Sequence, residues 1–197
     1  MTDSRTDIKS TLLFCGLLGV AMPGAIIAGH AEKYGALNNA VILVIRHAEK
    51  PAKGSDLTPA GKARAEAYVE YFRNFTLDGQ PLKLDSLFAA ADSKESHRAR
   101  LTLEPTAKKL GLAINSRFGD DQFRKLADEI RAKPHGKHIL ICWHHGEIPQ
   151  LIKALGANSD ELLPKGNWPD AVYNWVIMLR YDADGRLAEA KRIDEPF

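Results

Sequence analysis

Apolar runs along this chain are separated by amphipathic segments, a pattern that predicts alternating strands and helices. Two of the runs, at 41–45 and 138–143, are continuous enough to be typical of strands buried on both faces. The full set of predicted strands is 41–45, 84–91, 112–114, 138–143, 171–181 and 187–193, with a turn at 182–185 joining the last two.

The amphipathic segments between these runs predict helices. Thr58-Pro59 indicates a helix start, with Thr58 as the N-cap and Pro59 at the first helical position. That helix extends to about Phe75 and has an apolar face of Ala63, Ala67, Tyr68, Tyr71, Phe72 and Phe75. Further helices are predicted at 96–110, 120–132 and 148–155, the last ending at Gly156. The alternation predicts one α/β domain, a three-layer αβα sandwich with a mostly parallel central sheet.

Composition is consistent with a single globular domain. The 197 residues are 45% hydrophobic and 26% charged, with a formal net charge of +2. Basic residues are scattered among acidic ones, and the chain has no block of five or six like charges. We therefore expect no nucleic-acid partner, whereas a small anionic ligand needs only a local cluster of cations.

The first thirty-one residues have the composition of a secretory signal peptide. Arg5 and Lys9 precede an apolar stretch at 11–28, and Gly29-His30-Ala31 supplies small residues at a cleavage site. We expect cleavage to leave a periplasmic or secreted domain at 32–197. The alternative is an uncleaved membrane anchor, although Pro23-Gly24 would break such a helix.

Cleavage there would leave Cys142 as the only cysteine of the mature domain, so no internal disulfide can form. Its place in the apolar run at 139–142 indicates a buried side chain.

Unusual polar residues follow three of the predicted strands. Arg46-His47 follows the first strand, Arg98 lies beyond the strand at 84–91, and His144-His145-Gly146-Glu147 follows the strand that ends at Trp143. The carboxyl ends of parallel strands meet at one edge of a sheet, where open α/β sheets bind their ligands. We therefore expect these side chains to converge on one pocket, with the loop at 165–170 near its rim.

Such a group of side chains suits phosphoryl chemistry. Two arginines, two imidazoles and a helix N-terminus can bind a dianionic phosphoryl group. An imidazole can attack phosphorus in line and form a phosphohistidine, while arginines offset charge in the transition state. A carboxylate could protonate the leaving oxygen and then activate water. The spacing of His, Cys, Asp and Glu suggests neither a metal site nor another cofactor.

These residues resemble the motifs of a known family. Arg46-His47-Ala48-Glu49 resembles the Arg-His-Gly-Glu signature of the histidine phosphatase (phosphoglycerate mutase-like) superfamily. The segment 57–61, Leu-Thr-Pro-Ala-Gly, is similar to its Leu-Thr-x-x-Gly element, and 98–105 is similar to its second-arginine helix. The resemblance runs in order from about residue 41 to 155 and implies a phosphoglycerate mutase-like fold.

The resemblance also implies roles for individual residues. His47 would be the nucleophile, and Arg46, Arg98 and a second histidine would bind the phosphoryl group. Counting from the start of the strand places His144 at the second-histidine position, whereas the His-Gly dipeptide and a Trp-Glu-His pattern in a divergent branch favour His145. We give His145 a slight preference and expect the other histidine to line the pocket.

The sequence departs from the family pattern at two positions and leaves the proton donor open. Ala48 stands where the family usually has Gly, and Lys94 stands where it usually has Ser. Candidates for the donor are Glu147, Glu49, Asp120 and Asp121, and Glu147 is counted among the predicted site residues.

The sequence thus predicts an exported, metal-independent phosphomonoesterase that acts through a phosphohistidine. Its partners would be small-molecule or glycan phosphate esters or a phosphoprotein, with membrane contact only if the N-terminal segment is uncleaved. A non-catalytic phosphate-binding or envelope-associated protein of the same fold is the alternative. A mutase is disfavoured, because the chain lacks long insertions and carries an export signal.

Overall fold

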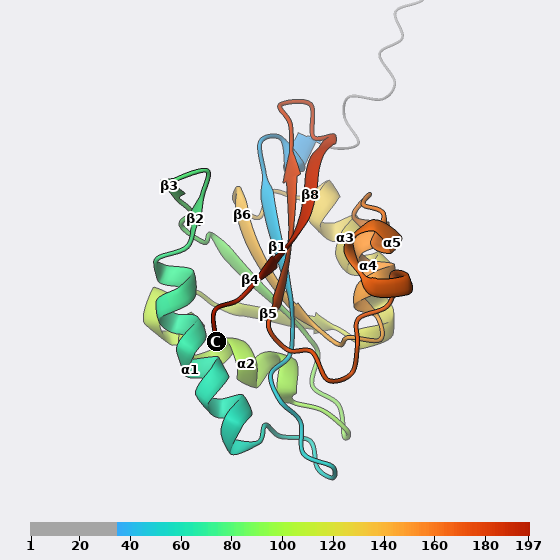
Figure 1. Cartoon of the computed structure of the whole chain (residues 1–197). Helices are drawn as coiled ribbons and strands as arrows, with labels where there is room; N and C mark the ends of the chain where they lie inside the picture. Colours follow the sequence, from blue (N-terminus) through green and yellow to red (C-terminus); the bar gives the residue numbers. More distant parts are fainter. Residues whose placement is uncertain (1–34) are drawn as a thin grey trace, which may run out of the picture.

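The computed structural model describes residues 35–197, so the predicted signal segment lies outside it. A six-stranded sheet forms the centre of the molecule, in the order β5-β4-β6-β1-β7-β8 (Figure 1). Four of its strands, β5, β4, β6 and β1, are parallel, whereas β7 pairs antiparallel with both β1 and the edge strand β8. The strands are β1 (Val41–Arg46), β4 (Ser86–Ala90), β5 (Ile114–Phe118), β6 (His138–Trp143), β7 (Trp175–Tyr181) and β8 (Leu187–Asp194).

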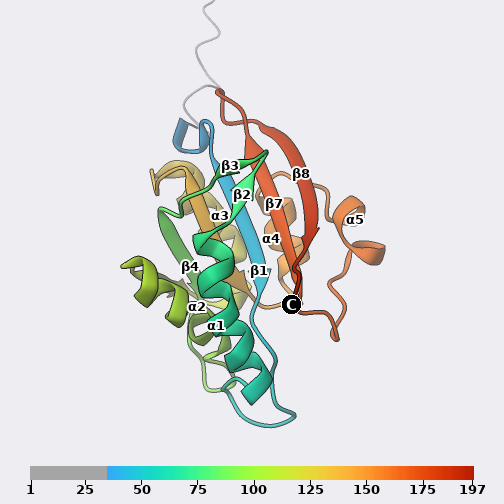
Figure 2. The ribbon, with the colours of Figure 1, turned by 60° about the vertical axis from the view of Figure 1, so that its left-hand side comes forward.

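Helices cover both faces of this sheet. The helices α1 (Pro59–Arg73) and α2 (Arg98–Leu110) lie on one face (Figures 1 and 2). The helices α3 (Phe123–Ala132), α4 (Ile148–Ala154) and α5 (Ser159–Leu162) lie on the other. The predicted three-layer αβα sandwich with a mostly parallel sheet is therefore confirmed. Within residues 35–197 no helix combines the length and the apolar character needed to cross a membrane.

Smaller elements complete the described part of the chain. A two-stranded hairpin of β2 (Thr76–Leu77) and β3 (Gln80–Pro81) follows α1. Three single-turn 3-10 helices are η1 (Gly35–Leu37), η2 (Asp120–Gln122) and η3 (Pro164–Gly166). The hairpin and α5 are elements that the sequence pattern did not predict.

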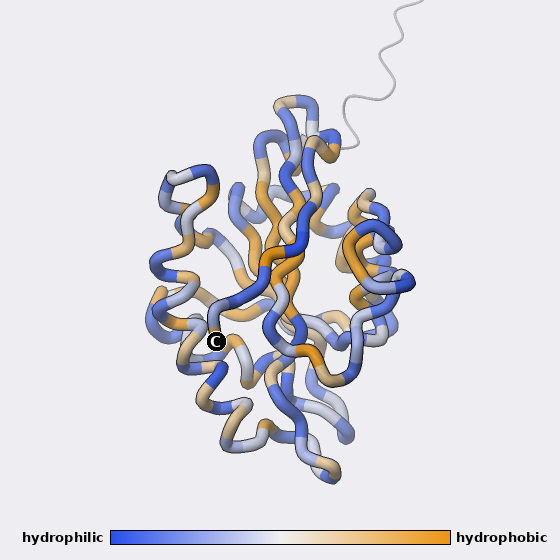
Figure 3. Tube along the Cα trace, viewed as in Figure 1, coloured by the Kyte–Doolittle hydropathy of each residue, from blue (hydrophilic) through white to orange (hydrophobic). Residues whose placement is uncertain are grey.

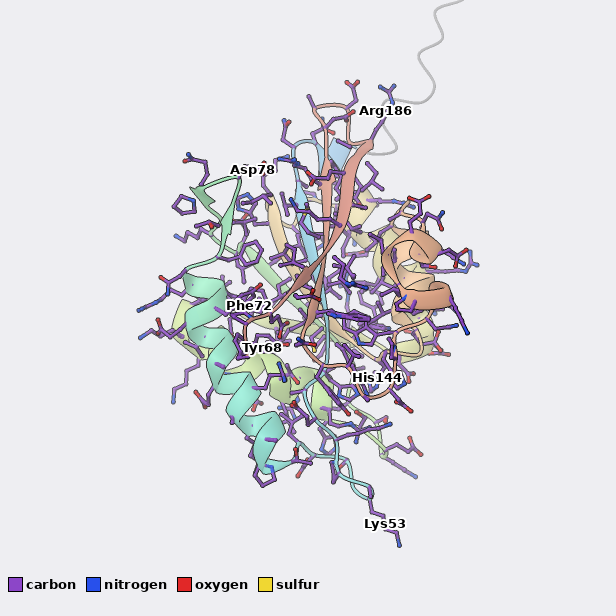
Figure 4. The ribbon with its side chains drawn as sticks, in the orientation of Figure 1. Lys53, Tyr68, Phe72, Asp78, His144 and Arg186 are labelled. Atoms are coloured by element: carbon purple, nitrogen blue, oxygen red, sulfur yellow. The ribbon has the colours of Figure 1, made fainter. Side chains whose placement is uncertain are left out.

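The core forms where apolar strands meet apolar helix faces. Every side chain of β1 is buried, and the tube coloured by hydropathy shows the central strands as its most apolar part (Figure 3). Tyr68 and Phe72 pack on the sheet from α1 (Figure 4), and each such buried side chain stabilises the fold by about 1.5–3 kcal/mol. One detail of the predicted α1 face is wrong, because Ala65 is buried and Ala63 is exposed.

Several predicted boundaries are also wrong. The strand expected from residue 171 is β7 and begins only at Trp175. The short strand expected at 112–114 is β5 and extends from Ile114 to Phe118. The helix expected from residue 120 begins as the 3-10 turn η2 and becomes α-helical only at Phe123. Cys142 lies in the core with no exposed surface, as predicted.

Candidate active site

The site begins where the neighbouring strands β1 and β6 end. Arg46 pairs with Trp143 in the parallel register, and the His47 backbone N–H donates to the Trp143 carbonyl at 3.0 Å. The residue directly after each strand is a histidine, so the register places His47 beside His144. Their ring centroids are 5.1 Å apart, with an angle of 64° between the planes. His144 lies at the end of the sheet where β1 leaves it (Figure 4).

His47 is buried, with 1% of its surface exposed. Its Nδ1 lies 2.7 Å from the Ala48 carbonyl oxygen. Because a carbonyl only accepts, Nδ1 carries the hydrogen and Nε2 keeps its lone pair. Burial, together with the charges of His144, Arg46 and Arg98, lowers the pKa of His47 to about 2. The ring is therefore neutral near pH 7, the form that can act as a nucleophile.

Thr102 of α2 supports the backbone that follows His47. The Ala48 N–H donates to the Thr102 hydroxyl at 2.9 Å, and that hydroxyl donates to the Arg98 carbonyl at 2.8 Å. Both Ala48 and Thr102 are fully buried. One hydroxyl thus sets the spacing between the His47 segment and the first turn of α2.

The start of α1 supports the same segment from another side. The Thr58 N–H donates to the Glu49 carbonyl at 3.0 Å, and the Thr58 side chain caps the helix by accepting from the Gly61 N–H at 3.0 Å. A Cβ on Gly61 would lie 2.6 Å from the Glu49 carbonyl oxygen. The Leu-Thr-Pro-Ala-Gly element therefore has a physical reason, since only glycine allows the helix to approach Glu49 this closely.

The fully buried Arg46 side chain has two functions. Its Nη1 donates to the carbonyls of Pro169, Asp170 and Val172 at 3.2, 2.7 and 2.9 Å. The Tyr173 ring stacks on the guanidinium at 3.8 Å. Its Nε and Nη2 are buried and have no hydrogen-bond partner among the described residues. Nη1 of this guanidinium holds the loop before β7. On the other edge Nη2 lies 3.6 Å from Asp170 Oδ1, and Nε is available for an anion.

Arg98 also has one nitrogen that binds backbone carbonyls and one that makes no hydrogen bond among the described residues. It is the first residue of α2, and its Nη1 donates to the carbonyls of Gly54 and Glu95 at 3.0 and 3.1 Å. Its Nε is buried and lacks a hydrogen-bond partner within residues 35–197. Because the charges of Arg46 and Arg98 both depress the pKa of His47, both guanidiniums act on the same ring. Arg46 and Arg98 thus form a cationic pair beside the neutral His47 ring.

The two adjacent histidines face different neighbours. Burial lowers the pKa of His144, and the nearby Asp120 opposes that shift. Trp143 brings Asp120 to this end of β6 by donating from Nε1 to the Asp120 carbonyl at 3.0 Å. His145 instead places its Nε2 2.8 Å from Asp170 Oδ1. The structure therefore puts His144, not the slightly preferred His145, against His47.

The carboxylates suggested as proton donors are spread around the site. Glu49 Oε1 accepts from Arg64 Nε at 2.9 Å. Asp120 and Asp121 are exposed, and Asp120 Oδ1 accepts from the Asp121 N–H at 2.9 Å. Glu147 is the partly buried N-cap of α4, and its side chain makes no hydrogen bond or ion pair in the described part of the chain.

No group of three or more His, Cys, Asp and Glu side chains in residues 35–197 is arranged to hold a metal ion. The available donors in the site are instead arginine and histidine nitrogens, which suit an anion.

Sequence reasoning missed some of the residues that shape the site. Asp170 belongs to the loop predicted near the rim, and the structure places it there. Tyr173 belongs to no motif and gave no signal, yet it covers Arg46 and lies 6.5 Å from the His47 ring. Thr102 was visible only as part of the second-arginine motif.

Comparisons with known proteins support this fold. No protein-family model and no curated protein matches the sequence. Among solved structures, the chain is similar to phosphoglycerate mutase from Plasmodium falciparum (TM-score 0.52, 16% identity, 81% of this chain and 91% of that one). It is also similar to a protein from Agrobacterium tumefaciens assigned as the phosphohistidine phosphatase SixA (TM-score 0.51, 20% identity, 77% and 97%). The chain therefore has a phosphoglycerate mutase-like fold, which the resemblance of its motifs implied.

Proposed function

We propose that this protein is an exported phosphomonoesterase that hydrolyses phosphate esters through a phosphohistidine at His47. The state of His47 carries this proposal, since its ring is buried, neutral and held through Nδ1 with Nε2 free. Around it lie guanidinium nitrogens that are buried and make no hydrogen bond among the described residues. A neutral nucleophile surrounded by unsatisfied cationic donors suits attack on a dianion.

In the proposed reaction, the phosphoryl oxygens bind the free edges of Arg46 and Arg98 and the ring of His144. His47 Nε2 then attacks phosphorus as the bond to the leaving oxygen breaks, which forms a P–N bond and releases the alcohol. Water next attacks the phosphohistidine, and phosphate leaves as Nε2 regains its lone pair. The arginines offset negative charge on the phosphoryl oxygens throughout.

The hydrogen bond from His47 Nδ1 to Ala48 assists both steps. It keeps the reactive tautomer before attack, and it stabilises the positive charge that the ring acquires when Nε2 binds phosphorus. The support from Thr102 and from the start of α1 keeps this geometry in place, which limits the motion of the nucleophile.

Purified protein tests the proposal. Wild-type protein should release phosphate from 4-nitrophenyl phosphate, in the presence of a chelator as well, and orthovanadate should inhibit it. His47→Ala should abolish turnover while the variant keeps its fold by circular dichroism. Brief reaction with ³²P-labelled substrate should label wild-type protein in an acid-labile, base-stable bond. Turnover that survives in His47→Ala would end the assignment.

Binding without turnover would support the second candidate, a phosphate-binding protein of the same fold. Calorimetric titration with phosphate distinguishes the two, because a non-catalytic protein would bind phosphate yet hydrolyse no ester in a broad panel. Substrates proposed for that panel are small-molecule and glycan phosphate esters and phosphoproteins.

Export is the part of the proposal that rests on the sequence alone. Expression in a bacterial host, followed by fractionation and mass spectrometry of the protein's N-terminus, tests it. We expect a periplasmic or secreted product that begins near Glu32. An intact N-terminus in the membrane fraction would support the uncleaved anchor instead.

A further inference from the structure

The proposed phosphoryl transfer needs a proton for the leaving oxygen. An alkyl phosphate that loses its alcohol without one would release a strongly basic alkoxide. The carboxylates suggested by sequence are poorly suited to supply it. Arg64 holds Glu49 in an ion pair, and Asp120 and Asp121 are exposed. The Glu147 side chain is oriented by no hydrogen bond or ion pair among the described residues. Another group near the phosphoryl site is therefore required.

His145 and Asp170 form a pair beside Arg46. Asp170 Oδ1 lies 2.8 Å from His145 Nε2 and 3.6 Å from Arg46 Nη2, a guanidinium nitrogen without a hydrogen-bond partner among residues 35–197. A single carboxylate oxygen thus joins the imidazole to the free edge of the phosphate-binding arginine. Lys50 Nζ lies 3.7 Å from the same oxygen.

The other ring nitrogen of His145, Nδ1, lacks a hydrogen-bond partner among the described residues. This atom is also buried. Buried polar atoms normally have partners, so an orphan atom beside a binding site indicates a ligand contact. With Nε2 held by a carboxylate and the second nitrogen free, His145 has the arrangement of an imidazole oriented for proton transfer.

We propose that His145, oriented by Asp170, is the proton donor of the phosphatase reaction, an inference that rests on the proposed function. The Nδ1–H of the imidazolium passes its proton to the leaving oxygen as the P–O bond breaks and the bond to His47 forms. The neutral imidazole then takes a proton from the water that attacks the phosphohistidine. Each turnover returns His145 to its starting state.

Charge in the complex favours the required protonated form. In the free protein, burial lowers the pKa of His145, Arg46 and Lys50 lower it further, and Asp170 opposes them. A bound phosphoryl dianion would add negative charge beside the ring and raise the pKa. Substrate binding therefore promotes protonation at the stage when the proton is needed.

Leaving-group dependence tests the proposal, because a donor matters only when the leaving group is basic. We compare kcat/KM for 4-nitrophenyl phosphate, whose phenolate leaves readily, with kcat/KM for glycerol 2-phosphate, whose alkoxide does not. His145→Gln should lower kcat/KM for the glycerol ester by about 10²–10⁴-fold and for the nitrophenyl ester by only a few-fold. Asp170→Asn should show the same preference, with a smaller loss. Asp170 is exposed, so this variant keeps the test valid if His145→Gln folds poorly.

Other outcomes overturn the proposal. An equal loss on both substrates, together with weaker vanadate binding, would make His145 a phosphoryl ligand. A selective loss on the glycerol ester in Asp120→Asn, with His145→Gln unaffected, would make Asp120 the donor. Failure of the proposed function would look different from failure of the donor proposal. In that case His47→Ala would still turn over the nitrophenyl ester.

Discussion

Replacing Thr102 by Val tests whether one buried hydroxyl supports the nucleophile. The change keeps the β-branched shape and nearly the same volume, so packing and helix propensity change little. It removes the acceptor of the Ala48 N–H and the donor to the Arg98 carbonyl, at 2.9 and 2.8 Å. Because Ala48 is fully buried, water cannot replace the lost acceptor.

The expected cost follows from that unsatisfied donor. An unpaired buried N–H costs about 1–3 kcal/mol, and the Arg98 carbonyl loses one of its donors. We expect Thr102→Val to lower the free energy of unfolding by about 2 kcal/mol. The segment after His47 would also be free to shift relative to Arg98, so kcat/KM for 4-nitrophenyl phosphate should fall about tenfold or more, since small misplacements at a reacting centre are costly.

Thr106→Val is a matched control one helical turn further along α2. Thr106 is also fully buried, but its hydroxyl has no hydrogen-bond partner in the described part of the chain. Removing an unsatisfied hydroxyl should be neutral or stabilising and should leave kcat/KM unchanged. Urea unfolding with a common m value measures both stabilities. Equal effects of the two substitutions, on stability or on turnover, would refute the reasoning.

Three further predictions concern residues around His47. Gly61→Ala should lower the urea midpoint, although alanine has the better helix propensity, because the new Cβ would lie 2.6 Å from the Glu49 oxygen. Arg46→Lys should lower kcat/KM by about 10²-fold or more, because an ammonium cannot hold three carbonyls and also bind phosphate; steady-state kinetics checks this. His47 should make stability depend on pH: its pKa is about 2 in the folded protein against an ordinary value of 6.5 in the unfolded chain, so between these values only the unfolded state binds the proton. As the pH falls below 6.5, the free energy of unfolding of wild type relative to His47→Gln should therefore fall by ~1.4 kcal/mol per pH unit. Urea unfolding at several pH values measures this difference. A difference that does not change with pH would mean that the ring titrates normally in the folded protein.

Sequence predicts an element well when its residue types suit only one kind of environment or one local conformation. Val41–Arg46 and His138–Trp143 are apolar enough to be buried on both faces, and both are central strands. Thr58-Pro59 starts α1 as predicted, because a cap and a preset φ angle act locally. In such segments local preference and tertiary environment agree.

Edge elements were harder to predict for a physical reason. β5 contains Asn115, Ser116 and Arg117, and it pairs only with β4 at the edge of the sheet. A strand with one neighbour and partial burial needs no apolar run, so its sequence resembles a loop. The loop that Arg46 holds is also beyond local prediction, because its carbonyls lie more than 120 positions along the chain from that arginine.

Strand register, and not a dipeptide motif, accounts for which histidine lies beside His47. Parallel pairing of Arg46 with Trp143 places the next residues, His47 and His144, side by side. His144 directly follows β6, whereas His145 belongs to the turn before α4, so the two side chains have different neighbours. The His-Gly dipeptide favoured His145, but a dipeptide carries no information about register. That same one-residue offset turns His145 toward Asp170, so the neighbouring position can take a different role in the reaction.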